Sequence, residues 1–303
     1  MESHEANWGC KYYGKDFEVK VGSLNLIGQS YEDVQGEPRF IYVFVHGLGV
    51  SLTFKHDFYP IINSIGGVAF ACDHIGHGRS PGDRVTCQIP EIVEETQKVI
   101  QLAKEKYPNL PVVLHGHSMG GLTVVSLAMN HPDFVRDHVK AMIVECPWIS
   151  QCPQKPVGWF TRNAVKLISK CFSTMRIESG VASVCEYEEE NWRNMHLQDE
   201  YRYSFLTPRL FTSVENEKIY VNANPDKFPK DVPTLFLQGM KDILVHPEQN
   251  IDWMQKVINA SPDAPFTYKS YEIGSHVLLK CKCRKQVIDD IFEFINKYLN
   301  SAE

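Results

Sequence analysis

A serine flanked by glycines is the first feature of this chain that could do chemistry. Ser118 stands between Gly116 and Gly120, directly after the apolar run Val112–Leu114. This spacing is typical of a nucleophile elbow, a strained strand-to-helix turn that needs glycines where strand and helix come together. Such a turn would expose the serine hydroxyl and aim the backbone N–H of Met119 at a developing oxyanion. The alternative is an idle serine in a glycine-rich turn.

A serine hydroxyl needs a histidine to take its proton and a carboxylate to orient that histidine. Asp242 follows the apolar run Thr234–Leu237, and His276 follows the predicted strand Phe266–Glu272. The order serine, acid, histidine, with each residue at the end of a strand, is the order expected for α/β-hydrolases. We therefore predict Ser118 as nucleophile, His276 as base and Asp242 as the orienting acid.

Other histidines and acids compete for these roles. Five histidines lie near strand ends but precede the serine in glycine-flanked turns, where we expect structural hydrogen bonding: His46, His74, His77, His115 and His117. His246 could line the mouth of the site. Glu145, which follows Ala141–Val144, is the alternative acid for His276, whereas Asp231 and Asp263 are interpreted as solvated loop charges.

A second glycine-rich turn follows the apolar run Ile41–Val45. It reads His46-Gly47-Leu48-Gly49, and its glycines allow the backbone to approach another segment closely. We predict that the N–H groups of Leu48 and Met119 form an oxyanion hole. A plain tight turn is the alternative.

The elements that must position these residues alternate between strands and helices. Short, nearly continuous apolar runs are typical of strands buried on both faces of a parallel sheet: Ile41–Val45, Val68–Cys72, Val112–Leu114, Ala141–Val144 and Thr234–Leu237. Helical spacing covers the stretches Glu91–Lys106, Leu122–Asn130, Gln249–Ile258 and Gln286–Leu299. An antiparallel hairpin of Phe17–Val21 and Leu24–Tyr31 precedes them. The pattern predicts an α/β fold with a mostly parallel, doubly wound sheet of about eight strands.

One long segment interrupts this alternation. Residues 147–229 lack a buried-strand run and are predicted to be an inserted helical cap between two parts of one core, residues 1–146 and 230–303. Within the cap, Gly158–Phe172 has an apolar face and a basic face. Two interpretations stay open: the apolar face packs over the site, which we favour, or the helix rests on an anionic lipid surface. Aromatic residues that could line an acyl tunnel are Trp159, Phe160, Trp192, Phe205 and Phe211.

Composition excludes several classes of protein. The net charge is -6 and no dense Lys/Arg run occurs, so no nucleic-acid partner is expected. The nine cysteines lack the spacings of a zinc site or a secreted disulfide framework, and Cys281-Lys-Cys283 is interpreted as ordinary. With a polar N-terminus and no long apolar run, we expect a reduced, cytoplasmic protein, peripheral on membranes or lipid droplets if the cap binds lipid. We expect no cofactor and no metal.

Taken together, the motifs resemble one branch of the α/β-hydrolases. They read Phe44-Val-His-Gly-x-Gly, Asp73-x-x-Gly-His-Gly-x-Ser, Gly116-His-Ser-Met-Gly-Gly, Gly-x-x-Asp242 and Gly-x-His276. The chain is similar to monoacylglycerol lipases and lysophospholipases, which are grouped with the serine aminopeptidases. The resemblance implies an α/β-hydrolase fold and hydrolysis of a lipid or acyl ester, with the Asp73 motif mainly structural. It also implies the triad Ser118, Asp242 and His276, and an oxyanion hole of Leu48 and Met119.

Two further functions are kept open. An aminopeptidase or amidase would need acids in the cap to bind an amino terminus, for which the candidates are Glu186, Glu188, Glu189 and Glu190. A non-catalytic ligand receptor could use the same fold. Epoxide hydrolase and dehalogenase chemistry is disfavoured, because these reactions use an aspartate where Ser118 stands. The motifs do not specify an oligomeric state.

Overall fold

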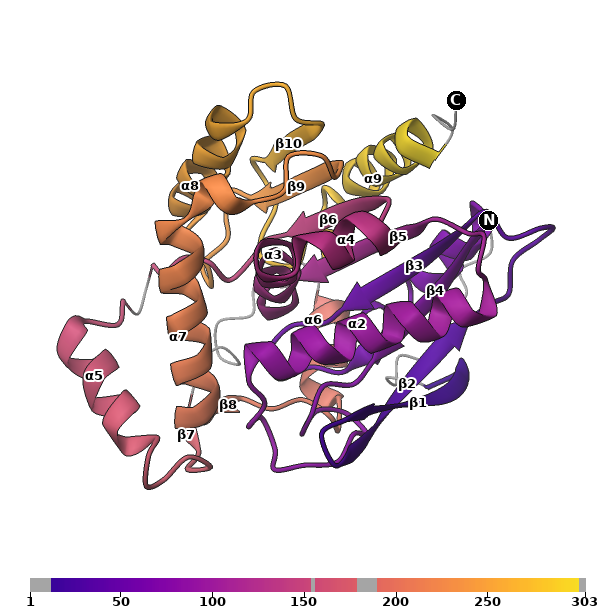
Figure 1. Cartoon of the computed structure of the whole chain (residues 1–303). Helices are drawn as coiled ribbons and strands as arrows, with labels where there is room; N and C mark the ends of the chain where they lie inside the picture. Colours follow the sequence, from indigo (N-terminus) through magenta and orange to yellow (C-terminus); the bar gives the residue numbers. More distant parts are fainter. Residues whose placement is uncertain (1–11, 154–155, 179–189, 300–303) are drawn as a thin grey trace.

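The computed structural model describes residues 12–153, 156–178 and 190–299, and its centre is one sheet (Figure 1). The chain opens with the antiparallel pair β1 (Lys15–Val21) and β2 (Leu24–Tyr31), joined through Gly22 at a φ of 58°. This hairpin was predicted. The further strands are β3 (Phe40–Val45), β4 (Gly67–Cys72), β5 (Val112–His117), β6 (Ala141–Glu145), β9 (Thr234–Gly239) and β10 (Phe266–Tyr271).

The strand order confirms the predicted architecture. The sheet has eight strands in the order β1-β2-β4-β3-β5-β6-β9-β10, and every pair from β4 onward is parallel. Because parallel strands share one carboxyl edge, the segments after β3, β5, β6, β9 and β10 open at the same edge. All five predicted site residues lie in or next to these segments.

Alternate residues of the strands enter two separate cores. In β3, Ile41, Val43 and Val45 join one core, which also contains side chains of α2 (Ile89–Lys106), α3 (Met119–Asn130), α4 (Pro132–His138) and α8 (Pro247–Ala260). The intervening Phe40, Tyr42 and Phe44 join the other, with α1 (Tyr59–Ser64) and α9 (Arg284–Leu299). Burying each such large apolar side chain contributes about 1.5–3 kcal/mol. The sheet is therefore stabilised by apolar packing on both faces where the segments with the predicted site residues leave it.

Between β6 and β9 the chain leaves the sheet. This stretch contains α5 (Trp159–Ile168), β7 (Ile177–Glu178), α6 (Glu190–Gln198), β8 (Phe205–Leu206) and α7 (Pro208–Ala223). The two short strands pair antiparallel, and α7 packs against α2, α3 and α5. Figure 1 shows α5 at the outer side of α7, away from the sheet. Reading this stretch as a cap domain, residues 147–229, stays a prediction.

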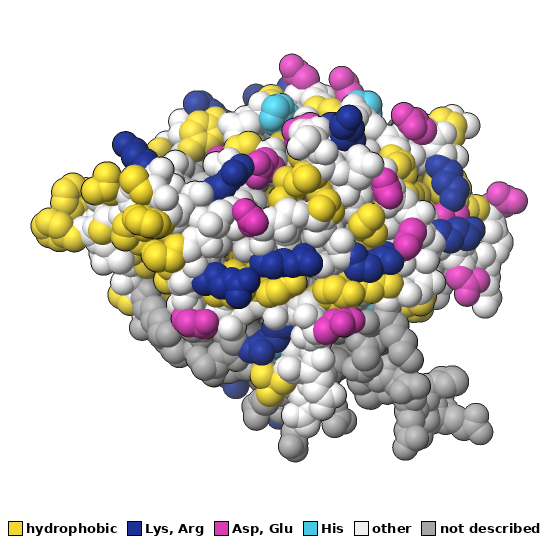
Figure 2. Space-filling model, turned by 90° about the horizontal axis from the view of Figure 1, so that it is seen from below, with side chains coloured by type: hydrophobic (Ala, Val, Ile, Leu, Met, Phe, Trp, Pro, Cys, Tyr) yellow, Lys and Arg dark blue, Asp and Glu magenta, His cyan; other side chains and the backbone are white. Residues whose placement is uncertain are grey.

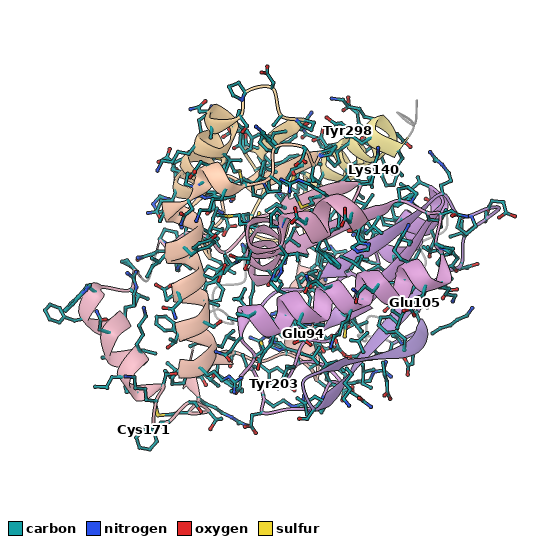
Figure 3. All side chains as sticks on the ribbon, viewed as in Figure 1. Glu94, Glu105, Lys140, Cys171, Tyr203 and Tyr298 are labelled. Carbon is teal, nitrogen blue, oxygen red and sulfur yellow. The ribbon has the colours of Figure 1, made fainter. Side chains whose placement is uncertain are left out.

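The favoured interpretation of α5 was wrong. None of its residues is buried, and Phe160, at 82% exposure, and Leu167, at 67%, face outward. Figure 2 shows apolar side chains gathered on the side of the molecule where Figure 1 places α5, and Cys171 just beyond this helix is labelled at the periphery in Figure 3. The side of α5 that meets α7 includes a polar contact, between Arg162 and the buried Glu215 (2.7 Å), so the apolar face is turned to the outside. Trp159 and Phe160 therefore do not line a tunnel.

Of the described helices, none combines the length and the apolar character that crossing a bilayer requires.

Candidate active site

Ser118 occupies a strained turn at the carboxyl end of β5. Its φ of 56° and ψ of -115° lie in a region that side chains rarely adopt, at a cost of about 1–3 kcal/mol. Backbone hydrogen bonds hold this conformation: Ser118 N donates to Glu145 O (3.0 Å), and Trp148 N and Leu122 N donate to Ser118 O (2.9 and 3.0 Å). The side chain that the turn presents is the one predicted as nucleophile.

The two glycines of the elbow are required by close backbone contacts. A Cβ atom on Gly116 would lie 2.3 Å from Gly120 O, and one on Gly120 would lie 2.0 Å from Val45 O. Either distance is far inside van der Waals contact, so neither position accepts a side chain. The glycines therefore allow β5, α3 and the end of β3 to meet around Ser118.

Asp242 and His276 are directly hydrogen-bonded. His276 Nδ1 donates to Asp242 Oδ2 at 2.7 Å, while Asp242 Oδ1 accepts from Leu244 N (2.8 Å) and Val245 N (3.0 Å). Both side chains are largely buried. With Nδ1 protonated, the other ring nitrogen of His276 is free to accept a proton. The carboxylate is thus fixed on both oxygens, and it fixes the histidine in the tautomer of a general base.

His117 joins the nucleophile to the histidine loop. It precedes Ser118, its Nε2 donates to His276 O (3.0 Å), and the two imidazole rings are 4.9 Å apart. Burial lowers the pKa of His117 well below its usual value, so the ring is neutral. Its Nδ1 has no hydrogen-bond partner among the described residues, and a Cβ on Gly47 would be 3.5 Å from it. From the sequence we expect only structural hydrogen bonding for His117.

The turn His46 to Gly49 lies against the nucleophile. A Cβ on Gly47 would be 3.2 Å from Ser118 Cβ, so a side chain at this position would crowd the serine. His46 Nδ1 donates to Gly47 O (2.9 Å). In a trans peptide the following N–H points opposite to the carbonyl, so this bond turns the N–H of Leu48 away from His46. On the far side, Gly49 O accepts from Tyr203 N (2.9 Å), a residue labelled in Figure 3.

The other predicted structural histidines have partners as well. His74 N donates to His46 Nε2 (3.1 Å), and the ring of His74 donates to Glu95 (2.8 Å) and to His46 O (3.0 Å). His77 Nδ1 donates to Ile75 O (3.1 Å). His115 binds Glu145 (3.0 Å). These contacts occupy the rings without bringing them to Ser118.

Asp73 braces the same region from β4. Its carboxylate accepts from Leu52 N (2.7 Å), Arg79 N (2.9 Å) and Tyr12 Oη (2.7 Å). Burial raises its pKa to about 6 despite these donors. Leu52 begins the short helix η1 (Leu52–Lys55), which follows the turn His46 to Gly49, the predicted oxyanion turn. The hydrogen bond from Leu52 N to Asp73 therefore helps to fix the position of that turn.

Glu145, the alternative acid for His276, contacts other side chains instead. Its carboxylate contacts Lys55 Nζ (2.9 Å) and His115 Nε2 (3.0 Å), while His276 pairs with Asp242. Lys55 was not singled out in the sequence analysis. The available signal was a lysine inside an otherwise buried segment, Leu-Thr-Phe-Lys, close after the glycine-rich turn.

An apolar cluster lies beside the triad. Its four residues pack together although they come from separate segments. Val50 follows the oxyanion turn, Phe54 lies in η1, Trp192 lies in α6 and Val277 follows His276. Phe205 and Phe211, also predicted to line a tunnel, are buried. Of the predicted amino-terminus site, Glu186, Glu188 and Glu189 lie outside the described residues, and Glu190 begins α6.

Two of the predicted triad residues and a neighbouring cysteine have the donor types of a metal site. Ligand atoms of Cys146, Asp242 and His276 lie within 4.8 Å of one another, and all three residues are buried. Two of these groups are already engaged with each other in the 2.7 Å hydrogen bond. The arrangement is therefore a hydrogen-bonded carboxylate–imidazole pair with a thiol beside it, a pair of the kind that can accept and hold a proton.

Comparisons with known proteins show the family and the fold. A family model described as "Serine aminopeptidase, S33" matches residues 36–280. Human monoglyceride lipase is 28% identical over 272 residues, which cover 88% of this chain and 84% of the relative, and the rat enzyme of the same name is 25% identical over 257 residues, which cover 82% and 79%. A solved monoglyceride lipase of Saccharomyces cerevisiae, in complex with a substrate analog, aligns with a TM-score of 0.80 at 18% identity, covering 95% and 96% of the two chains. The monoacylglycerol lipase of Paleococcus ferrophilus aligns with a TM-score of 0.76 at 21% identity, covering 90% and 99%.

Proposed function

The chain belongs to the serine aminopeptidase S33 family and has the α/β-hydrolase fold, and from this premise we propose that it cleaves lipid esters through an acyl-enzyme on Ser118. It is a carboxylic-ester hydrolase. The observation that carries the proposed mechanism is the 2.7 Å bond between His276 and Asp242, together with a serine held at positive φ whose preceding residue, His117, donates to His276 O.

In the proposed reaction, His276 removes the proton of Ser118 as the hydroxyl oxygen attacks the ester carbonyl. Asp242 stabilises the imidazolium that forms. The N–H groups of Leu48 and Met119 bind the oxyanion of the tetrahedral intermediate, where one such donor contributes about 2.7–4 kcal/mol. His276 then gives its proton to the leaving alcohol. In the second half, His276 activates a water that hydrolyses the acyl-enzyme and frees Ser118.

The proposed substrate is a monoacylglycerol or a lysophospholipid. Its support is the apolar cluster of Val50, Phe54, Trp192 and Val277 beside the triad, which suits an acyl chain. The relatives named monoglyceride lipase agree with this choice. An aminopeptidase would need a free carboxylate near Ser118 to bind the substrate's ammonium group. Asp242 is hydrogen-bonded to His276 and Glu145 is paired with Lys55, so neither carboxylate is available to an ammonium group, which favours the ester.

A graded substrate panel tests this proposal. Purified protein would be assayed on 2-monoacylglycerols, lysophosphatidylcholine and aminoacyl 4-nitroanilides, with Ser118→Ala as control. We expect turnover of a long-chain ester that Ser118→Ala abolishes. Turnover confined to aminoacyl amides would refute the ester proposal, and turnover that survives in Ser118→Ala would refute the mechanism.

We also propose that α5 brings the site to an anionic phospholipid surface. Its exposed Trp159, Phe160 and Leu167, with Phe172 just beyond, form an apolar surface on which Lys166 and Lys170 supply positive charge. Aromatic and basic residues together are typical of interfacial helices. The location would be a reducing cytoplasm, which the seven free cysteines of the described ranges support.

Vesicle sedimentation tests this second proposal. Vesicles containing phosphatidylserine should bind the protein more strongly than pure phosphatidylcholine vesicles. Trp159→Ser/Phe160→Ser should reduce binding to both. The matched control is Ile219→Ser, which removes an exposed apolar side chain from α7. Equal binding of the double variant and the control variant would contradict the proposal.

A further inference from the structure

A fully buried ion pair lies behind the active site and takes no part in the proposed mechanism. Lys55 Nζ is 2.9 Å from Glu145 Oε2 and 3.2 Å from Oε1, and both side chains have no exposed surface. Removing two charges from water is costly, and replacing such a pair by uncharged residues is often neutral or stabilising. Stability alone therefore gives no reason for Lys55 and Glu145.

The surrounding groups keep the carboxylate of Glu145 ionised. Burial by itself would raise the pKa of Glu145, but the ammonium of Lys55 and the hydrogen bond from His115 hold it well below its usual value. His115 Nε2 donates to Glu145 Oε2 (3.0 Å), which leaves His115 Nδ1 to accept from Tyr42 Oη (2.5 Å). Burial lowers the pKa of His115 and raises that of Tyr42, so both are neutral and the donors match the acceptors. The cluster has one arrangement of protons and a fixed geometry.

The pair connects the two halves of the catalytic machinery. Glu145 is the last residue of β6, and its backbone oxygen accepts the N–H of the strained Ser118 (3.0 Å). Lys55 is the last residue of η1, which follows the oxyanion turn. Glu145 thus contacts Ser118 through its main chain and, through its side chain, the helix η1 that follows the turn with Leu48.

Aromatic contacts extend this connection to the histidine. The ammonium of Lys55 lies 5.6 Å from the centre of the Phe44 ring and 5.8 Å from that of Phe54. Phe54 in turn stacks on His117, with the ring centres 5.6 Å apart and an angle of 21° between the planes. Because His117 donates to His276 O, a displaced η1 would also disturb the base.

We propose that Lys55 and Glu145 are positioning residues that set the distance between the oxyanion turn and Ser118. This inference rests on the proposed ester hydrolysis. In this proposal the pair contributes to stabilisation of the transition state and not to binding of the substrate. Loss of the pair therefore lowers kcat and leaves KM nearly unchanged. A misplaced donor forfeits part of the hundredfold or larger effect of a whole oxyanion-hole donor. We expect kcat to fall about tenfold.

Three variants separate positioning from stability. Lys55→Met leaves a carboxylate buried without its cation, and Glu145→Gln leaves an ammonium buried without its anion, so each lowers Tm. Lys55→Met/Glu145→Gln removes both charges, while the amide oxygen still accepts from His115. The double variant should regain much of the lost Tm and keep the low kcat. A purely structural pair would regain both together.

Rates are expressed per reactive active site, so that unfolded protein does not lower the measured kcat. Active sites are titrated with a fluorophosphonate, and kcat and KM are measured on 4-nitrophenyl butyrate. The Ki of an alkyl trifluoromethyl ketone is measured as well, because its hemiketal oxyanion occupies the same hole. The Ki should rise by about the factor by which kcat falls. Lys285→Met/Asp289→Asn, which removes an exposed pair with an N–O distance of 2.6 Å, is the matched control and should change neither.

The outcomes distinguish this inference from the proposed function. A double variant with wild-type kcat and Ki per titrated site would overturn the inference while the ester hydrolysis stands. Turnover by Ser118→Ala in the same assay would overturn the proposed function and the inference with it. A lowered kcat with a raised Ki and restored Tm supports the positioning role.

Discussion

Replacing Asp242 with asparagine should nearly abolish catalysis while leaving the fold intact. In the structure, Asp242 Oδ1 accepts from Leu244 N and Val245 N, and Oδ2 accepts from His276 Nδ1. An asparagine in this place must turn its oxygen toward the two backbone donors. Its NH2 group then faces His276 Nδ1 as a donor, and the imidazole must present Nδ1 as an acceptor. The proton of His276 moves to the ring nitrogen that should receive the proton of Ser118.

The size of the effect follows from this change of tautomer. A base locked in the wrong tautomer in a serine triad lowers kcat by about 10⁴, which corresponds to about 5.4 kcal/mol of transition-state stabilisation. The side chains have nearly the same volume, and two backbone hydrogen bonds remain, so we expect little change in Tm. Initial rates on 4-nitrophenyl butyrate, per titrated site, measure kcat, and differential scanning fluorimetry measures Tm.

The control is Asp263→Asn, which changes an exposed carboxylate in the loop before β10. It should leave kcat and Tm as they are. A loss of less than tenfold in Asp242→Asn would refute the reasoning, because His276 would then not depend on this carboxylate. A large loss of kcat with an equally large fall in Tm would show that the hydrogen bond is structural.

Three further predictions concern stability. Gly120→Ala places a Cβ 2.0 Å from Val45 O, so the free energy of unfolding in urea should fall by about 1–3 kcal/mol or more; an unchanged midpoint would contradict the elbow geometry. Ser118→Gly relieves the positive φ and should be about 1 kcal/mol more stable than Ser118→Ala; equal stability would mean that the turn carries no strain. Burial and the neighbouring His74 lower the pKa of His77 to about 3. Between pH 6.5 and 3, His77 is therefore protonated in the unfolded chain but not in the folded chain. Stability through His77 is complete above pH 6.5 and falls by up to about 1.4 kcal/mol per pH unit below it, and His77→Gln should show a shallower loss between pH 7 and 5.5.

The sequence predicts the mostly parallel sheet, and with it the meeting of Asp242 with His276, because a parallel sheet constrains where the segments after its strands lie. Parallel strands of a doubly wound sheet share one carboxyl edge, so residues placed after Val112–His117, Thr234–Gly239 and Phe266–Tyr271 must meet there. The glycines around Ser118 mark the close backbone contacts that this meeting requires. The bond between Asp242 and His276 is a direct result.

Other features depend on contacts that periodicity does not encode. The pattern of α5 indicates which residues share a face, but it does not indicate where that face points, and Phe160 faces outward. Lys55 and Glu145 are 90 positions apart, and a lysine is ordinarily expected at the surface. Their contact arises because the segment after β3 crosses over the end of β6. The contact between Arg162 and Glu215 also joins residues far apart in the sequence, so periodicity does not predict it.

The central claim is that Ser118 carries the acyl group, and rapid-quench mass spectrometry tests it most directly. The protein would be mixed with excess 4-nitrophenyl butyrate, quenched in acid within the first turnovers and digested. We predict that the peptide containing Ser118 gains the mass of one butyryl group, and that Ser118→Ala shows no acylated peptide. A wild-type enzyme that turns over the ester with the butyryl group on another residue, or on none at any quench time, would contradict the account.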